Sequence, residues 1–114
     1  AINLKNGKIL WKRPYGKIFT KISQSETKLV SGSPIWGGIA TISSGVIVAS
    51  GSFDSNLYFY NTKKGDEIHS IQLDAPGSSP PVIYDYNGNI FVSVVAVGAA
   101  QTVNKGRYIY GIGF

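Results

Sequence analysis

The fold of this chain is decided by one stretch, GSPIWGGIATISSGVIVASGSFDSNLYFYNTKKG, which covers residues 32–65. It consists of short apolar or aromatic runs separated by glycine, serine and asparagine, a pattern typical of β-strands joined by tight turns. The pattern predicts a first strand over residues 35–42 with a break at its glycines, further strands at residues 46–49 and 56–60, and a fourth at residues 67–73. Because the connections are too short to hold a helix, we expect four successive antiparallel strands.

The same pattern recurs elsewhere in the chain. Residues 1–11 (AINLKNGKILW) align with residues 59–69 (FYNTKKGDEIH), which matches Asn3 with Asn61 and Gly7 with Gly65. Ser33-Pro34 is echoed by Ser79-Pro80, Gly45-Val-Ile-Val by Gly88-Asn-Ile-Phe, and residues 56–60 by residues 107–114. The repeat is therefore about one four-stranded unit long, which is the size of a β-propeller blade.

This repeat predicts an all-β fold of about two propeller blades, with no significant helix. Residues 1–14 are expected to form strands three and four of one blade, residues 33–74 a complete blade, and residues 79–114 the first three strands of the last. Residues 14–32 have few periodic apolar residues and are predicted to be a long connecting loop, where a propeller could display function. Because residue 1 is an alanine within a predicted strand, we expect a piece of a longer protein or a processed product.

The composition excludes several classes of protein. Hydrophobic residues make up 43% of the 114 residues, but no apolar run approaches the roughly 20 residues of a membrane helix. The absence of cysteine excludes a disulfide framework, a thiol nucleophile and a thiolate metal site. Asp66 and Glu67 are adjacent and would face opposite sides of a strand, so they cannot act as paired carboxylates. We therefore predict no catalytic residue in this chain.

The aromatic residues at equivalent positions of the repeat are predicted to have packing roles. Trp11 ends the first repeat and His69 takes the same position in the second. Trp11 is expected to dock against the neighbouring blade. His69 is the one histidine and has no second ligand at a useful spacing, so no zinc site is predicted and a packing role is favoured.

The net charge of +5 is concentrated near the start of the chain. Most of the lysines and arginines lie in the first 28 residues, where Glu26 is the one acid. A solvated strand face with a charged edge explains this distribution, because edge strands commonly carry lysine. The alternative is attraction to an anionic surface or a single-stranded nucleic acid, for which Tyr15 and Phe19 would supply stacking residues. We expect no nucleic-acid partner.

Trp36, Gly37, Gly38 and Asp54 are the candidate binding residues. Two glycines weaken a strand, so they indicate a close approach of the backbone to another group. In one interpretation the glycine backbone packs closely against other parts of the protein at the crowded propeller axis. In the other, the glycines leave a surface without side chains, so that a flat ligand can lie near Trp36. Asp54 either forms its turn through the side chain or contacts the ligand.

Several motifs together carry a family resemblance: SPIWGG at 33–38, Gly45-Val-Ile-Val, GSFDSNL at 51–57, Asn61-x-x-x-Gly65, Asn87-Gly88 and KGRYIYG at 105–111. With these motifs the chain resembles the C-terminal end of the pyrroloquinoline quinone (PQQ)-dependent dehydrogenases, and most of all their membrane glucose dehydrogenase branch. The resemblance covers nearly the whole chain except residues 15–28. The chain departs from that branch where Tyr58 replaces an arginine, His69 a tryptophan, and Gly98-Ala99-Ala100 a Gly-Gly-His sequence.

This resemblance implies an eight-bladed propeller that holds PQQ beside a calcium ion near its axis. Such a protein oxidises a sugar or alcohol by hydride transfer to the quinone, passes the electrons to a respiratory acceptor and works in the periplasm. Trp36, Gly37 and Gly38 would contact or border PQQ, and Asp54 would lie near the pocket. The catalytic aspartate and the calcium ligands of the family lie in earlier blades. We therefore expect a chain that is inactive alone and binds neither PQQ nor calcium by itself.

The alternative function is a non-catalytic propeller module for binding or assembly, in which Trp36 and its glycines serve packing only. In both cases the rest of a propeller is the expected partner. Open sheet edges also favour association between several copies of the chain, because unpaired strand edges attract other strands. Contact with a membrane is expected only through regions outside this chain.

Overall fold

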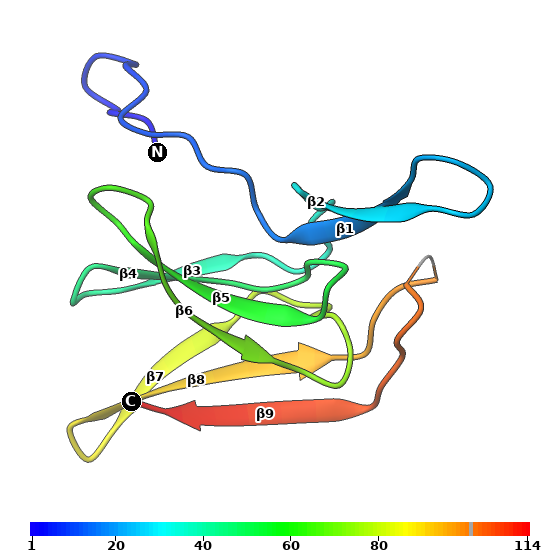
Figure 1. The fold of residues 1–114 in the computed structure, drawn as a ribbon. Helices are drawn as coiled ribbons and strands as arrows, with labels where there is room; N and C mark the ends of the chain where they lie inside the picture. The colour runs from blue at the N-terminus through cyan, green and yellow to red at the C-terminus, as the bar shows by residue number, and fades with distance from the viewer. Residues whose placement is uncertain (101) are drawn as a thin grey trace.

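The computed structural model describes residues 1–100 and 102–114, whose regular secondary structure is entirely β-strand (Figure 1). The described strands form a two-stranded, a four-stranded and a three-stranded antiparallel sheet. Their bounds are β1 (Lys17–Lys21), β2 (Thr27–Ser31), β3 (Ile39–Ile42), β4 (Val46–Ala49), β5 (Asn56–Asn61), β6 (Glu67–Gln72), β7 (Val82–Tyr86), β8 (Asn89–Ala96) and β9 (Tyr108–Gly113). The prediction of an all-β chain is confirmed. In this part of the chain no helix has the length and apolar character needed to cross a bilayer.

The four-stranded sheet contains β3 to β6 in chain order. Strands β4 to β6 begin and end within one residue of the predicted bounds, whereas β3 begins at Ile39 and leaves out Ile35 and Trp36, which were predicted to belong to its strand. The tight turn between β3 and β4 closes with a hydrogen bond in which the Gly45 N–H donates to the Ile42 carbonyl at 3.0 Å. Gly45 has a φ of +91°, which glycine adopts without a steric penalty. The serine-glycine turn expected from the sequence therefore correctly predicts where β3 ends and β4 begins.

The three-stranded sheet contains β7, β8 and β9, also in chain order. Asn87 and Gly88 form the two-residue connection between β7 and β8, with φ values of +52° and +75°. Positive φ at both positions defines the turn type that matches the twist of a β-hairpin. This geometry explains why the Asn-Gly pair correctly predicts a hairpin turn at this position.

The hydrophobic core lies between these two sheets. Its most buried large side chains are Val48 and Leu57 from the four-stranded sheet and Val92 and Val94 from β8. Alternate residues of β8 face this core, as expected for a strand that is covered on one side. Burying each such side chain contributes roughly 1.5–3 kcal/mol, so the contact between the two sheets is the main source of stability.

Residues 1–11 reproduce the turn between β5 and β6, as the sequence repeat predicts. The Asn3 N–H donates to the Lys8 carbonyl and the Gly7 N–H to the Asn3 carbonyl, both at 2.8 Å. Asn61, Asp66 and Gly65 make the same two bonds at the same lengths, and both glycines have a φ of +69°. The predicted N-terminal hairpin is therefore present, although its strand pairing is reduced to a bridge between Ile2 and Ile9.

Trp11 docks this N-terminal hairpin onto the four-stranded sheet. Its indole Nε1–H donates to the Thr62 carbonyl at 2.9 Å. The ring covers Gly65 so closely that a Cβ there would lie 2.6 Å from the indole Cδ2 atom. Arg13 adds an exposed ion pair with Asp66 at 2.9 Å, which contributes little by itself. The predicted packing role of Trp11 is confirmed by these contacts.

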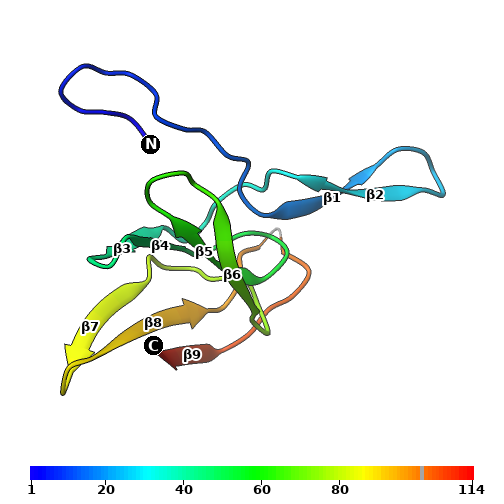
Figure 2. The ribbon, with the colours of Figure 1, turned by 60° about the vertical axis from the view of Figure 1, so that its left-hand side comes forward.

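The prediction of a long loop over residues 14–32 is wrong. The segment forms the hairpin of β1 and β2, in which Ile18 lies opposite Val30 and Phe19 opposite Leu29. Figure 2 shows this hairpin extending away from the two stacked sheets. The sequence obscured it because lysine, threonine and serine fill most of the remaining positions and leave no clear alternation of apolar residues.

Candidate functional site

The predicted site residues lie in two loops at the same end of the four-stranded sheet. Trp36, Gly37 and Gly38 immediately precede β3, and Asp54 lies in the turn between β4 and β5. Because Ile39 pairs with Ala49, the start of β3 and the end of β4 are neighbours. The Trp36 N–H donates to the Gly51 carbonyl at 3.1 Å and joins the two loops.

Three backbone segments cross one another beside Ser50, and glycine makes the crossing possible. A Cβ on Gly37 would lie 2.6 Å from the Ser50 carbonyl oxygen, and one on Gly77 would lie 2.8 Å from the Ser50 Cβ. The Ser50 hydroxyl donates to the Ser79 carbonyl at 2.6 Å and secures the third segment. The predicted close approach of backbone at Gly37 is therefore real, and its neighbour is Ser50.

Gly38 makes a second close approach in the same region. A Cβ on Gly38 would lie 2.9 Å from the Cγ atom of Pro80. The Gly38 carbonyl accepts a hydrogen bond from the Ser50 N–H at 2.9 Å. At both positions a side chain would collide with neighbouring residues, so packing within the chain is sufficient to explain the two glycines.

The indole of Trp36 lies at the surface of this end. It stacks on Phe53, with ring centroids 6.3 Å apart and an interplanar angle of 14°. The side chain is 46% exposed. One face of the indole is thus supported by an aromatic ring while much of the side chain remains open to a ligand.

The carboxylate of Asp54 accepts four hydrogen bonds. Its Oδ1 accepts from the Ser52 hydroxyl at 2.5 Å and the Asn56 N–H at 3.0 Å. Its Oδ2 accepts from the Lys17 N–H at 2.8 Å and the Tyr58 hydroxyl at 2.5 Å. A carboxylate offers about four lone-pair positions, so this one has no free capacity for a ligand or a metal ion. Asp54 ties the turn before β5 to the start of β1.

Three tyrosines next to Asp54 hold their protons more tightly than usual. Tyr58 is 4% exposed, and burial, followed by its hydrogen bond to Asp54, raises the pKa of its hydroxyl. Burial also raises the pKa of Tyr15, whose ring meets Tyr58 edge to face at 5.7 Å. Burial and then the charge of Glu67 raise the pKa of Tyr60 to about 12. The cluster is therefore a neutral packing surface at physiological pH.

The tyrosine cluster predicts a loss of stability at alkaline pH. A tyrosine whose folded pKa is raised stabilises the fold fully below its unfolded pKa of roughly 10. Above that value the unfolded chain releases the proton first, so stability falls as the pH rises toward 12. We expect the urea midpoint to decrease steadily from pH 10 to 12, as followed by circular dichroism. Tyr60→Phe should reduce this decrease, whereas Tyr86→Phe, at an exposed site, should leave it unchanged.

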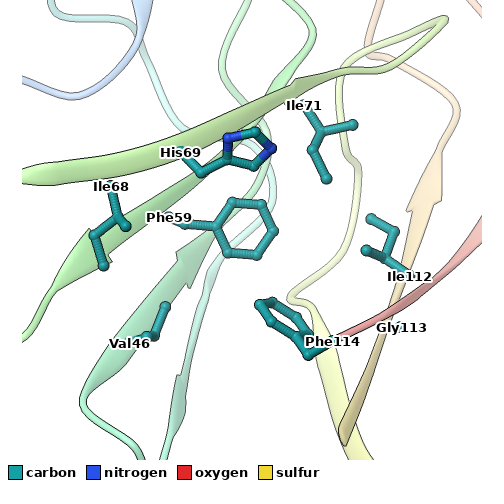
Figure 3. A pocket seen from close by; sticks show the side chains of 8 residues that line it. All are labelled: Val46, Phe59, Ile68, His69, Ile71, Ile112, Gly113 and Phe114. Atoms are coloured by element: carbon teal, nitrogen blue, oxygen red, sulfur yellow. The ribbon is translucent and has the colours of Figure 1, made fainter.

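His69 lies in an apolar pocket of about 260 Å³ between the four-stranded sheet and β9 (Figure 3). Its ring is 6.0 Å from that of Phe59, which also meets Phe114 edge to face at 5.5 Å. Among the described residues, no group of three histidine, cysteine, aspartate or glutamate side chains could hold a metal ion. The His69 side chain is nevertheless exposed on β6, so the packing role predicted for it stays a prediction.

A larger cleft, of about 810 Å³, opens between the β1–β2 hairpin, the turn before β5 and the loop between β8 and β9. We call it the hairpin cleft, and its walls include Phe19, Leu29, Phe53, Asn56, Gln72 and Asn104. This cleft is not predicted from the sequence, because one of its walls belongs to the segment that was predicted to be a loop. Asp54 and Phe53 line this cleft, whereas Trp36, which stacks on Phe53, does not.

Comparison with known proteins defines the class to which this fold and site belong. Residues 1–92 match the model of the PQQ-type glucose/ethanol/alcohol dehydrogenase β-propeller domain. The chain belongs to this family, and the predicted PQQ-type propeller fold is thereby confirmed.

Quinoprotein dehydrogenases and a glycerol dehydrogenase are among the proteins to which the chain is similar. The chain is 27% identical over 113 residues to the quinoprotein glucose dehydrogenase of Escherichia coli, covering 96% of this chain and 14% of that protein. It is 33% identical over 64 residues to a quinoprotein alcohol dehydrogenase of Pseudomonas putida, which covers 56% of this chain and 11% of that protein. A glycerol dehydrogenase large subunit of Gluconobacter oxydans is 28% identical over 106 residues, which cover 86% of this chain and 14% of that protein. The chain thus spans about a seventh of the first and third of these relatives.

Proposed function

We propose that this chain is part of a PQQ-dependent dehydrogenase that oxidises a sugar or an alcohol, and that it forms one wall of the cofactor pocket. The family match over residues 1–92 carries the proposal. The 46% exposed indole of Trp36, directly before Gly37 and Gly38, supports it. The chain alone is expected to be inactive, because it holds no arrangement of nucleophile, base and orienting acid within the described residues.

The residues before β3 fit PQQ better than they fit calcium. PQQ is a flat aromatic quinone, and the open part of the Trp36 indole, backed by Phe53, suits stacking against such a ring. When bound, PQQ would accept the hydride removed from the substrate. A calcium ion requires six to eight oxygen ligands, and the carboxylate of Asp54 is already saturated. In this proposal Trp36, Gly37 and Gly38 border PQQ, while Asp54 shapes the pocket by holding its turn.

The strand arrangement suggests how the chain fits into a ring of blades. We propose that β3 to β6 form the complete blade within residues 33–74, and that β7 to β9 are the first three strands of the blade at 79–114. The hairpin of residues 1–14 then represents the outer strands of the preceding blade. Remaining blades of the parent protein would cover the open edge of β9, and without them several copies of the chain could associate there. By family resemblance the parent protein acts in the periplasm and supplies the calcium ligands and any membrane contact.

A non-catalytic role as a binding or assembly module is the second candidate. Two observations favour it: the glycines before β3 are accounted for by packing against Ser50 and Pro80, and Asp54 by its four hydrogen bonds. In that case Trp36 would only cover Phe53.

Retention of PQQ separates the two functions. The chain would be incubated with PQQ and excess calcium and passed through a gel-filtration column, and quinone absorbance in the protein peak would be measured. No stable complex with the isolated chain is expected, but one wall of the pocket should leave a weak co-elution at high protein concentration that falls at least fivefold in Trp36→Ala and is unchanged in Tyr86→Ala, a control at an exposed aromatic residue of β7. The absence of co-elution, or equal loss in both variants, would contradict a cofactor wall and favour the assembly module.

A further inference from the structure

We infer that the hairpin cleft is a docking site for a partner protein, which it binds through a short acidic peptide segment that carries one or two large apolar side chains. The inference does not rest on the proposed function, because neither PQQ nor a dehydrogenase substrate takes part in it. It assigns a role to the β1–β2 hairpin, a segment outside the motifs that carry the family resemblance.

The cleft is built from three separate parts of the chain and has room for a short peptide. Its volume is about 810 Å³. Its walls come from the hairpin, the turn between β4 and β5, and the loop between β8 and β9. The hydrogen bond from the Lys17 N–H to the Asp54 carboxylate fixes the base of the hairpin against that turn. The base of the cleft is therefore formed before any partner arrives.

The walls of the cleft leave large apolar side chains uncovered. Phe19 of β1 is 73% exposed, and Val103 of the loop after β8 is 98% exposed. Leu29, which lies opposite Phe19 in the hairpin, is exposed as well. Apolar residues that gather around one cleft, rather than standing singly on the surface, mark an interaction site. An apolar side chain of a partner would shield all three from water at once.

Positive charge lies on two sides of the cleft. Lys17 and Lys21 are on the same face of β1 as Phe19, because alternate residues of a strand share a face. On the other side, Lys105 and Arg107 follow directly after the loop residues that line the cleft, and both are exposed. Complementary charge is what selects and orients a partner at such a surface. Acidic side chains on both sides of an apolar anchor would therefore meet a cation on either side.

The one acid among the described residues that line the cleft does little to offset these cations. This acid is Asp54, and its carboxylate accepts four hydrogen bonds from the protein, which disperse its charge. Glu26 lies in the turn of the hairpin, beyond the end of β1. The surroundings of the cleft therefore attract an acidic segment and repel a basic one.

Two amide side chains that line the cleft can serve a peptide backbone. The Gln72 Nε2 donates to the carbonyls of Asp54, Ser55 and Leu73 at 3.0, 3.3 and 3.2 Å. The Asn56 Nδ2 donates to the Asp54 carbonyl at 3.3 Å. Because these NH₂ groups are used within the protein, the amide oxygens of Asn56 and Gln72 are what a partner meets. The backbone N–H groups of a peptide are donors that match these oxygens.

A peptide fits these features better than an anionic membrane or a single-stranded nucleic acid does. The tip of the hairpin, residues 22–26, carries the acid Glu26 and one large apolar residue, which does not suit entry into an anionic bilayer (Figure 2). The Tyr15 ring packs edge to face against Tyr58 and its hydroxyl is buried. Of the two stacking residues that the sequence suggests, only Phe19 is therefore free to stack on a base.

Fluorescence anisotropy with three labelled peptides tests this inference. The first peptide has two leucines flanked on each side by two glutamates, the second has lysines in place of the glutamates, and the third has serines in place of the leucines. We expect the first to bind saturably, and the second and third to bind about tenfold and threefold more weakly. Higher salt should weaken binding of the first peptide, because it screens the charges around the cleft. Equal affinity for the first peptide and either of the others would overturn the inference.

Variants identify the cleft as the place where the peptide binds. Phe19→Ala should weaken binding of the first peptide about fivefold or more, and Lys21→Glu about threefold or more. The matched controls are Ile22→Ala, at an exposed position of the same hairpin outside the cleft, and Lys8→Glu, which makes the same charge change in the N-terminal turn. Both controls should bind as the unmodified chain does. An equal loss in Lys21→Glu and Lys8→Glu would reveal attraction by net charge alone and would overturn the assignment to the cleft.

Two competing probes decide between the classes of partner. Single-stranded oligodeoxythymidylate and vesicles of phosphatidylglycerol would be titrated under the same conditions as the first peptide. We expect both to bind more weakly than the peptide and to be insensitive to Phe19→Ala. If either binds more tightly and loses its affinity in Phe19→Ala, the peptide is the wrong partner and the cleft belongs to nucleic acid or anionic lipid.

Discussion

Gly51→Ala is expected to abolish cooperative folding of the four-stranded sheet. Gly51 has a φ of +95°, a conformation that costs a residue with a Cβ about 1–3 kcal/mol. Its Cβ would also lie 2.7 Å from the Gly37 Cα and 3.0 Å from the Gly77 carbonyl oxygen. Both neighbours are backbone atoms that cannot rotate away. The total should exceed about 4 kcal/mol, a large part of the 5–15 kcal/mol that stabilises a typical domain.

Gly88→Ala is the matched control for this prediction. Gly88 also has a positive φ, +75°, but no atom lies within 4 Å of the position a Cβ would take. Gly88→Ala should therefore lower the free energy of unfolding only by the cost of a positive φ, roughly 1–2 kcal/mol. Urea unfolding followed by circular dichroism would compare the two variants. Similar midpoints would show that the backbone crossing at Ser50 can open without cost and would contradict the packing described above.

Asp54→Ala should destabilise the chain by roughly 2–4 kcal/mol. It leaves the buried Tyr58 hydroxyl without its acceptor and frees the Lys17 N–H at the base of the hairpin. A buried donor without a partner costs about 1–3 kcal/mol. Because the hydrogen bond to Asp54 helps to raise the pKa of Tyr58, ultraviolet titration should show that pKa decreasing in the variant. Hydrogen exchange at the Lys17 amide should become faster.

Asp85→Ala gives the comparison that isolates the role of Asp54. Asp85 also accepts a backbone hydrogen bond in a turn, from the Gly88 N–H at 3.1 Å, but it is exposed. Its removal should cost about 1 kcal/mol or less. If both variants unfold at the same urea concentration, Asp54 is an ordinary turn residue and the hairpin is held by other contacts.

The sequence predicts the two larger sheets well because their turns carry distinct chemistry. Gly45, Gly65 and the Asn87-Gly88 pair all have the positive φ values that these residue types tolerate. The recurrence of Asn-x-x-x-Gly at residues 3–7 and 61–65 reflects identical hydrogen bonds, so the alignment of the repeats had a structural cause. Local rules were sufficient where the turn itself determines the strand pairing.

The β1–β2 hairpin was missed because its pairing is weakly encoded. Each strand has only two large apolar residues, and the turn between them closes with hydrogen bonds from Ile22 and Ser23 to the Glu26 carbonyl without glycine, proline or asparagine. Its base is fixed by a contact distant in sequence, between Lys17 and Asp54. Such a contact cannot be read from the local pattern of either segment.

The candidate site was predictable only in part for the same reason. The glycines before β3 correctly indicated a close backbone approach, yet its partners, Ser50 and Pro80, follow from the folded chain. The turn role of Asp54 could be anticipated, but the saturation of its carboxylate depends on donors from β1 and β5. The cofactor contacts predicted for Trp36, Gly37, Gly38 and Asp54 stay predictions.

The docking of Trp11 onto Gly65 has a consequence for how such chains can grow. The indole and the glycine belong to consecutive repeats; the first repeat carries both a glycine, Gly7, and the tryptophan, whereas the second carries Gly65 but has His69 at the tryptophan position. Duplication of the first repeat in a gene would therefore create a new joint with its complementary surfaces already in place, and duplication of the second would not. Lengthening by tandem duplication of that first repeat needs no simultaneous second change, whereas loss of the tryptophan or the glycine at one repeat weakens only the joint in which it takes part.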